Sequence, residues 1–187
     1  MHCDGTCSHL ALVRIHQRYT SSMMEAPPEE AQGTVGNEHL YCEVKGSEAY
    51  FLKRTYRSGE AHGQAQFHLS IDIIGLIEAV YIPHSLASGK KPTGFIYQIE
   101  GTGEAAIVAA KISCQGDGVT QITLGTLRYI KIPRGKTARI LMVFDIEGGS
   151  GREYKIVVNR INYKLDPSDA RYKKIDAAME TSTLKMQ

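Results

Sequence analysis

The stretch Thr137-Ala-Arg-Ile-Leu-Met-Val-Phe-Asp-Ile-Glu147 decides the fold that the sequence predicts. From residue 140 to residue 146 every second side chain is apolar: Ile140, Met142, Phe144 and Ile146. Glycine-containing turns bound the stretch on both sides. A period of two between such turns indicates a β-strand with one buried face. We therefore expect residues 137–147 to form the central and best-buried strand.

The two neighbouring segments, residues 120–132 and 152–165, show broadly the same period of two. The turns between the three segments are residues 133–136, which contain Pro-Arg-Gly-Lys, and residues 148–151, which contain three glycines. Short turns between successive strands favour hairpin connections. The sequence therefore predicts an antiparallel meander in which the three strands lie side by side.

Further strands are predicted before the meander, each bounded by turn residues. Gly46-Ser47 is predicted to join two strands as a hairpin, and Gly75 is predicted to break a long apolar segment by a reversal or a bulge. The alanine-rich segment 104–114 mixes helix and strand formers, and its place between two turns favours a strand. The predicted strands cover residues 39–45, 49–56, 67–73, 76–82, 95–99 and 104–114. With the meander they make about eight or nine strands, which indicates an all-β antiparallel β-sandwich or barrel.

The two ends of the chain are predicted to differ from this core. Residues 1–37 contain a Pro-Pro pair flanked by glutamates, which favours an extended or disordered leader, although residues 10–16 would suit a short edge strand. Residues 38–165 form the predicted sandwich domain. Residues 166–187 are predicted to be a short C-terminal helix and tail, because Asp166 and Pro167 suit a helix start and Tyr172, Ile175 and Met179 recur at helical spacing.

Composition excludes several classes of protein. The 187 residues suit one domain, and 42% apolar with 22% charged residues is typical of a globular chain. A net charge of +2 argues against nucleic-acid binding unless the cations cluster. The sequence contains no run of about 18 apolar residues, so no transmembrane helix is predicted. No signal peptide is recognised either, and a soluble chain is expected. The four cysteines are predicted to be free thiols: Cys3, Cys7, Cys42 and Cys114.

Motifs for catalysis or metal binding are weak. His2, Cys3, Cys7 and His9 carry groups that metals prefer, but all four lie in one short segment, so neither a metal site nor a cofactor is predicted. Residues 99–106 resemble half of a dinucleotide fingerprint but lack a parallel strand and a helix, which favours a β-turn. Residues 148–151 lack the spacing of a nucleophile elbow. The histidines His62, His68 and His84 could pair with Asp72, Glu78 or Asp145, yet nothing in the sequence brings them together.

Two basic loops carry the candidate binding residues. Lys90 and Lys91, and Arg134 and Lys136, each place two cations beside a glycine whose backbone N–H could help to bind an anion. The loops would share one end of the fold only if the chain reverses at Gly75. Tyrosines near strand ends offer a second, polar-aromatic face: Tyr41, Tyr56, Tyr81, Tyr97, Tyr129, Tyr154 and Tyr163.

The sequence therefore predicts a non-enzymatic binding or assembly module that recognises an anionic ligand or a glycan through loops on a rigid scaffold. The first alternative is a structural subunit of a homo-oligomer, coat-like or fibre-like, with a swapped N-terminal arm. The second alternative is a hydrolase or metal-dependent enzyme that uses the histidines.

Overall fold

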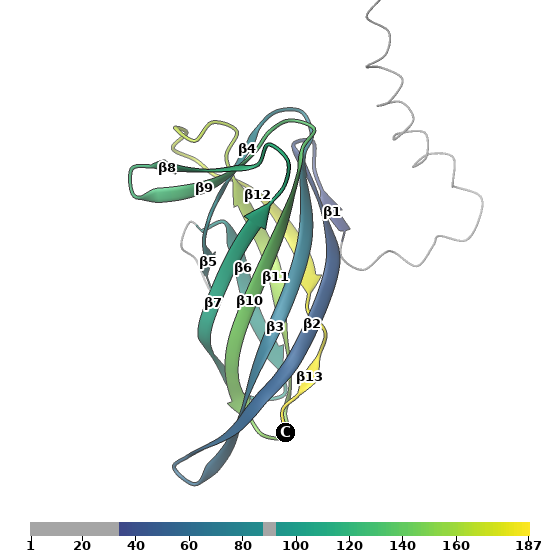
Figure 1. The fold of residues 1–187 in the computed structure, drawn as a ribbon, viewed down its shortest axis with the longest axis vertical. Coiled ribbons are helices and arrows are strands. Elements are labelled where there is room, and N and C mark those ends of the chain that lie inside the picture. The colour runs from purple at the N-terminus through teal and green to yellow at the C-terminus, as the bar shows by residue number, and fades with distance from the viewer. Residues whose placement is uncertain (1–33, 88–92) are drawn as a thin grey trace, which may run out of the picture. The chain divides into compact units, whose positions relative to one another are not determined.

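The computed structural model describes residues 34–87 and 93–187, and these residues are all-β, as predicted (Figure 1). Thirteen strands are present in the described residues, and the C-terminal helix is not among their elements. No helix of these residues could cross a membrane. The predicted leader lies almost wholly outside the described residues, as do Lys90, Lys91 and the cluster of His2, Cys3, Cys7 and His9.

The strands form three sheets. The first has the order β1-β2-β3-β10-β7, the second β12-β11-β6-β5 with β13 also paired to β11, and the third β4-β9-β8. Pairing is antiparallel except between β5 and β6. The first sheet consists of β1 (Thr34–Gly36), β2 (Leu40–Arg57), β3 (Glu60–Gly75), β10 (Thr137–Gly149) and β7 (Ala105–Gln115). The second consists of β12 (Lys173–Glu180), β11 (Glu153–Tyr163), β6 (Phe95–Gly101), β5 (Leu86–Ala87) and β13 (Leu184–Lys185). The third consists of β4 (Val80–Pro83), β9 (Leu127–Ile132) and β8 (Thr120–Leu124).

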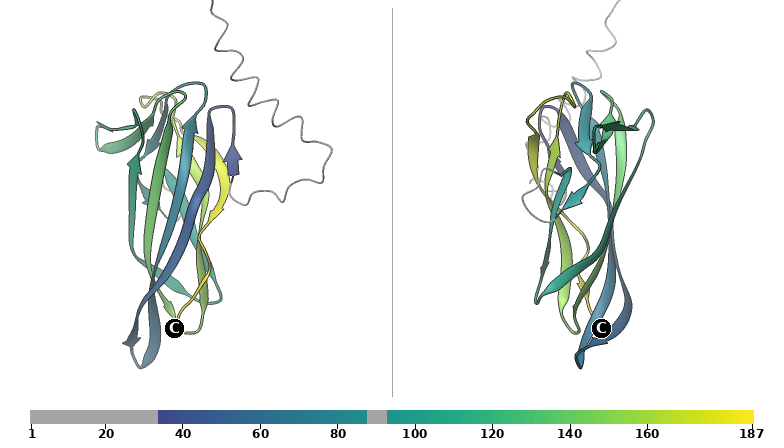
Figure 2. Two further views of the ribbon diagram at one scale, coloured as in Figure 1. Left: turned by 45° about the vertical axis from the view of Figure 1, so that its right-hand side comes forward. Right: turned by 90° about the vertical axis from the view of Figure 1, so that its left-hand side faces the viewer.

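The first two sheets pack face to face as a sandwich, and Figure 2 shows the two layers. Their inward side chains join one apolar core in which most members have no exposed surface. A ring contact across the layers joins Phe144 of β10 to Tyr97 of β6, with centroids 4.8 Å apart and planes at 61°. Tilted aromatic pairs of this kind add to the stability gained from burial.

The strand predicted at residues 137–147 is confirmed, but it is not the best-buried one, since a larger share of β11 is buried. β10 lies between β3 and β7, and its inward residues Ala138, Ile140, Met142, Phe144 and Ile146 are fully buried. The period of two succeeds here because alternate side chains of a strand point to opposite faces, and only one face of this sheet meets the other layer.

The predicted meander is wrong. β9, β10 and β11 belong to three different sheets, and β10 pairs with β3 and β7. The turns at residues 133–136 and 148–151 carry the chain from one sheet to another and make no hairpin. Period and turn length identify a strand and its buried face, but they do not identify its neighbour.

The predicted hairpin at Gly46-Ser47 is also wrong. β2 runs without interruption from Leu40 to Arg57, and a bulge at Lys45 precedes Gly46, which pairs with Ser70 of β3. The chain reverses instead at Ser58 and Gly59, whose φ angles of 53° and 86° are those of a two-residue hairpin turn. A glycine in a strand marks a bulge as readily as a turn, which explains the error.

The break at Gly75 is confirmed, since β3 ends there and the chain continues into β4 of the third sheet. The predicted C-terminal helix is wrong, because residues 173–180 form β12. Ile175 and Met179 are buried and Ala177 packs on the core between them, which is a period of two. A spacing of four residues fits both a helix and a strand. Asp166 accepts a hydrogen bond at 2.8 Å from the backbone N–H of Ser168 and forms a local turn.

Candidate functional site

The predicted basic residues are described only in part. Arg134 and Lys136 are exposed in the turn between β9 and β10. The Lys136 ammonium donates to a carboxylate oxygen of Asp117 at 2.6 Å. This hydrogen bond and the positive charge hold the pKa of Asp117 below its usual value. The charge of Lys136 therefore already has an acidic partner.

The backbone of the same turn is also engaged. The N–H of Gly135 donates to Gly75 O at 2.6 Å, and that of Lys136 donates to Pro133 O at 3.1 Å. An anion nest needs such N–H groups to point outward together. The backbone N–H groups of Gly135 and Lys136 are therefore already engaged within the protein. The anion site of Lys90, Lys91, Arg134 and Lys136 stays a prediction.

The three candidate histidines do not converge on the candidate acids. His62 and His68 lie on the outer face of β3, where His68 contacts Gln66 at 2.7 Å and the ring of Tyr50. His84 follows β4. Burial is the main reason that the pKa of His84 is lowered, and a backbone hydrogen bond opposes this shift. The acids bind other partners, since Asp72 accepts from Arg139 and Asp145 accepts from Gln66. Among residues 34–87 and 93–187, no three His, Cys, Asp or Glu side chains gather as a metal site would require.

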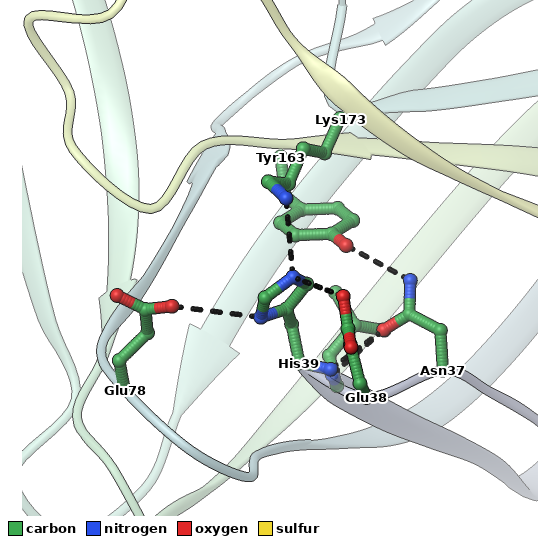
Figure 3. A network of polar contacts seen from close by, with 7 residues as sticks. Asn37, Glu38, His39, Glu78, Tyr163 and Lys173 are labelled. Atoms are coloured by element: carbon green, nitrogen blue, oxygen red, sulfur yellow. Dashed lines mark hydrogen bonds and ion pairs between the residues drawn. The ribbon is translucent and has the colours of Figure 1, made fainter.

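A polar cluster that the sequence did not reveal surrounds His39 in the turn between β1 and β2 (Figure 3). The Nδ1 atom of His39 lies 3.5 Å from Glu78, and its Nε2 atom lies 3.0 Å from Glu38 and 3.1 Å from the Lys173 ammonium. One Nε2 atom cannot both donate to a carboxylate and accept from an ammonium. The Nε2 atom can therefore hydrogen-bond to only one of these two partners at a time.

Asn37 and Tyr163 complete the cluster. The Asn37 amide donates to the Tyr163 hydroxyl at 2.8 Å, while its carbonyl oxygen accepts from the backbone N–H groups of His39 and Leu40. Burial raises the pKa of Tyr163 despite the opposing hydrogen bond from Asn37. These contacts join the β1–β2 turn to β11, to β12 and to the loop after β3. Most of these polar groups bind one another, so the cluster is suited to fastening the end of the sandwich, but the buried Nδ1 atom of His39 has no hydrogen-bond partner among the described residues.

A second polar cluster surrounds Lys164, which is 7% exposed. Its ammonium donates to the backbone oxygens of Pro167 and Asp169 and lies 4.6 Å from the ring centroid of Tyr172. The ring of Tyr129 lies on another side at 5.9 Å. Burial and contact with Tyr129 raise the pKa of Tyr172 to about 12. A desolvated ammonium between aromatic faces and carbonyls is well stabilised, so this cluster also holds the structure together.

The predicted tyrosine face does not form as one surface. Four of its seven members are buried: Tyr97, Tyr129, Tyr154 and Tyr163. Tyr56, by contrast, is 71% exposed near the end of the β2–β3 hairpin. Alternation along a strand does not distinguish a tyrosine that fills the core from one that faces solvent at the strand's end.

A depression of about 280 Å³ lies on the outer face of the first sheet. Its lining residues are Ser70, Ser113, Cys114, Gln115, Arg139 and Leu141. Arg139 is held by two hydrogen bonds to Asp72, at 2.8 and 3.0 Å. The lining therefore offers hydroxyl and amide groups but no acid and base poised on a common substrate.

One edge of the first sheet is formed by β7. This strand of eleven residues ends the first sheet, and among the described residues it pairs with β10 alone. Lys111 is its only charged residue. Its inward residues Ile107, Ile112 and Cys114 are only partly covered, and Val108 is 60% exposed beside a bulge. An edge strand directs alternate N–H and C=O groups away from its sheet, which makes it a template for another strand.

Comparison with models of known protein families gives no match to this chain. A search of curated proteins likewise finds no significant relative.

Proposed function

We propose that the chain is a non-enzymatic assembly subunit that pairs with a second copy of itself along β7. The observation that carries this proposal is the long, lightly charged edge of the first sheet, which has no partner strand among residues 34–87 and 93–187. Proteins usually protect edges with short strands, prolines, bulges or several charges. At the opposite edge of the same sheet β1 covers only residues 41–43 of β2, and the rest of β2 carries several charged residues, as the rule requires. β7 carries a bulge near Val108 and a single lysine.

The partial burial of β7 supports a strand as its partner. Ile107, Ile112 and Cys114 pack against the core from one side and keep exposed surface on the other. A strand added to β7 would satisfy the free backbone groups and cover this apolar surface together. Such a contact uses the same surface on both subunits and closes as a two-fold dimer.

Charge restricts the register of that dimer. A two-fold axis at Lys111 would place two ammonium groups directly opposite each other, which destabilises a strand pair. An axis at Ile112 places Lys111 opposite Ser113 of the second copy and Ala110 opposite its Cys114. This register uses only the regular part of β7, after the bulge. We therefore expect the axis at Ile112.

The polar clusters support a non-enzymatic role. The groups around His39 and Lys164 contact one another at short range, and each ties separate strands or loops together. A catalytic site needs an acid, a base or a nucleophile directed at a position where a substrate can lie. Both clusters are better suited to stabilising the subunit that assembles.

The test compares association of three proteins by light scattering over a dilution series. The edge variant Val108→Lys with Ala110→Lys adds two charges to exposed positions of β7. The control variant Leu124→Lys with Leu127→Lys adds the same charges at the end of the β8–β9 hairpin, where both leucines are also exposed. Thermal melting checks that each variant folds. We expect the wild type and the control to dimerise and the edge variant to be monomeric.

A monomeric wild type at high concentration, or equal dissociation of both variants, would refute the proposal. A cross-link then tests the register. In a background with Cys3→Ser and Cys7→Ser, Ala110→Cys should form a disulfide with Cys114 of the second copy. Positions 110 and 114 of one strand are about 13 Å apart, too far for an internal bond. A further Cys114→Ser change should abolish the cross-linked dimer.

A further inference from the structure

The β2–β3 hairpin extends beyond the end of its neighbouring strand (Figure 1). The last pair between β10 and β3 is Gly149 with His62. Past that point β2 and β3 pair only with each other, through Tyr56 with Ala61 and Arg57 with Glu60. Residues 56–61 therefore carry their own paired backbone beyond β10, while residues 53–55 pair with a part of β3 that β10 still covers. We call residues 52–62 the hairpin end. It is independent of the β7 edge and of the proposed assembly.

Exposed apolar and cationic groups lie close together in the sequence of the hairpin end, where Arg54 also donates from Nε to Gln187 O at 3.2 Å. Leu52 is 52% exposed and Tyr56 is 71% exposed, and Lys53 and Arg54 beside Leu52 are exposed as well. Across residues 52–62 the sequence has three cations and one carboxylate, a balance of +2 that equals the net charge of the entire chain. The hairpin end thus combines a cluster of positive charge with two large side chains that gain little from contact with water.

We propose that the hairpin end docks onto an anionic lipid surface. Leu52 and Tyr56 would enter the boundary between headgroups and acyl chains, where a tyrosine keeps its hydroxyl in water and buries its ring. Lys53 and Arg54 would extend their charges to the lipid phosphates. Because insertion stops at the boundary, where water and headgroups are still present, the outward backbone groups of the hairpin keep hydrogen-bond partners.

The composition of the hairpin end favours lipid over a nucleic acid or a sulfated glycan. A polyanion would engage the cations, but its charged backbone offers no apolar region for Leu52. Lipid satisfies both kinds of side chain at once. Removal of Leu52 and Tyr56 should therefore weaken lipid binding and leave binding to a polyanion nearly unchanged, which distinguishes the two kinds of ligand.

The test is co-sedimentation with phosphatidylcholine vesicles that contain or lack phosphatidylserine. The hairpin variant is Leu52→Ser with Tyr56→Ser, and the matched control is Leu124→Ser with Leu127→Ser, which removes two leucines of similar exposure from the β8–β9 hairpin. We expect the wild type and the control to bind only the phosphatidylserine vesicles, more weakly as salt rises. The hairpin variant should lose about tenfold in affinity.

Three outcomes would overturn the proposal. The wild type could fail to bind phosphatidylserine vesicles at low salt, or the control could lose as much affinity as the hairpin variant. Binding to heparin or DNA could also match lipid binding and survive the hairpin substitutions, which would identify a polyanion as the ligand. Matched thermal melting of the variants excludes unfolding as the cause. The monomeric edge variant should bind individual vesicles like the wild type, which separates this proposal from the assembly proposal.

Discussion

Replacement of Phe144 by alanine should be among the most damaging single changes in the chain. The side chain is fully buried in the middle of β10 and pairs across the first sheet with Phe67 of β3 and Ala110 of β7. Its ring also meets Tyr97 of the opposite sheet with centroids 4.8 Å apart. The substitution therefore removes apolar burial and a contact between the two layers.

The expected cost follows from these contacts. Truncation of a buried phenylalanine to alanine lowers the free energy of unfolding by roughly 3–5 kcal/mol, since rigid surroundings fill the cavity only in part. The contact with the ring of Tyr97 places the expected loss in the upper half of this range, because an aromatic pair contributes about 0.5–1.5 kcal/mol beyond burial. For a domain of this size the change corresponds to a fall of roughly 6–20 °C in the melting temperature.

His68→Ala is the matched control, because His68 lies on the neighbouring strand with its side chain on the outer face. It contacts Gln66 and the ring of Tyr50, so its loss should cost less than about 1 kcal/mol. Urea unfolding with a common slope gives both values. If His68→Ala lowers the midpoint more than Phe144→Ala, the assignment of inward and outward faces on β3 and β10 is wrong.

Three further changes test other parts of the fold. Gly148→Ala should cost about 1–3 kcal/mol in urea unfolding, because an added Cβ would lie 2.6 Å from the buried ring of Tyr154; Gly46→Ala, where the nearest contact would be 3.9 Å, should be nearly neutral. Lys164→Met should cost about 1–3 kcal/mol by leaving backbone oxygens without a donor, and an unchanged midpoint would remove the role given to its cluster. Burial raises the pKa of Cys42 from 9.0 to about 12, so this thiol should resist a thiol reagent until unfolding. The unfolded chain releases that proton first as pH rises, so the Cys42 contribution to stability should be lost between about pH 9 and 12, and Cys42→Ala should reduce the loss.

Sequence periodicity predicted individual strands better than their arrangement. β10 and β7 were identified because alternation and bounding turns are local properties. The order β3-β10-β7 depends on pairs about 60 to 90 positions apart between β3 and β10 and about 25 to 45 apart between β10 and β7, and no local pattern contains that information. The errors at Gly46 and at residues 173–180 have a similar origin. In both places a residue type or a spacing fits two conformations, and packing against the other sheet selects one of them.

The polar clusters were hidden for the same reason. His39 reads as the first residue of a strand, and its partners come from the loop after β3, the end of β11 and the start of β12. Lys164 reads as an ordinary charge at a strand end. A pattern could have indicated the β7 edge, since an eleven-residue strand with one charge is unusual on an exposed surface. The sequence could not show that this strand lies at the edge.

The two proposals together make a prediction that neither makes alone. β7 and β3 run in the same direction, because each pairs antiparallel with β10, and the hairpin end lies at the start of β3. In a two-fold dimer the two β7 strands run in opposite directions, so the two hairpin ends must point in opposite directions along the joined sheet. One flat membrane can then contact only one hairpin end of each dimer.

The dimer should therefore bridge two vesicles. We expect wild-type protein to raise the turbidity of phosphatidylserine vesicles at concentrations where light scattering shows dimers. The monomeric Val108→Lys/Ala110→Lys variant should bind the vesicles with similar affinity but leave them dispersed, and the Leu52→Ser/Tyr56→Ser variant should dimerise without either effect. A dimeric wild type that binds vesicles without clustering them would contradict antiparallel pairing through β7, because only a parallel arrangement of the subunits directs both hairpin ends to the same surface.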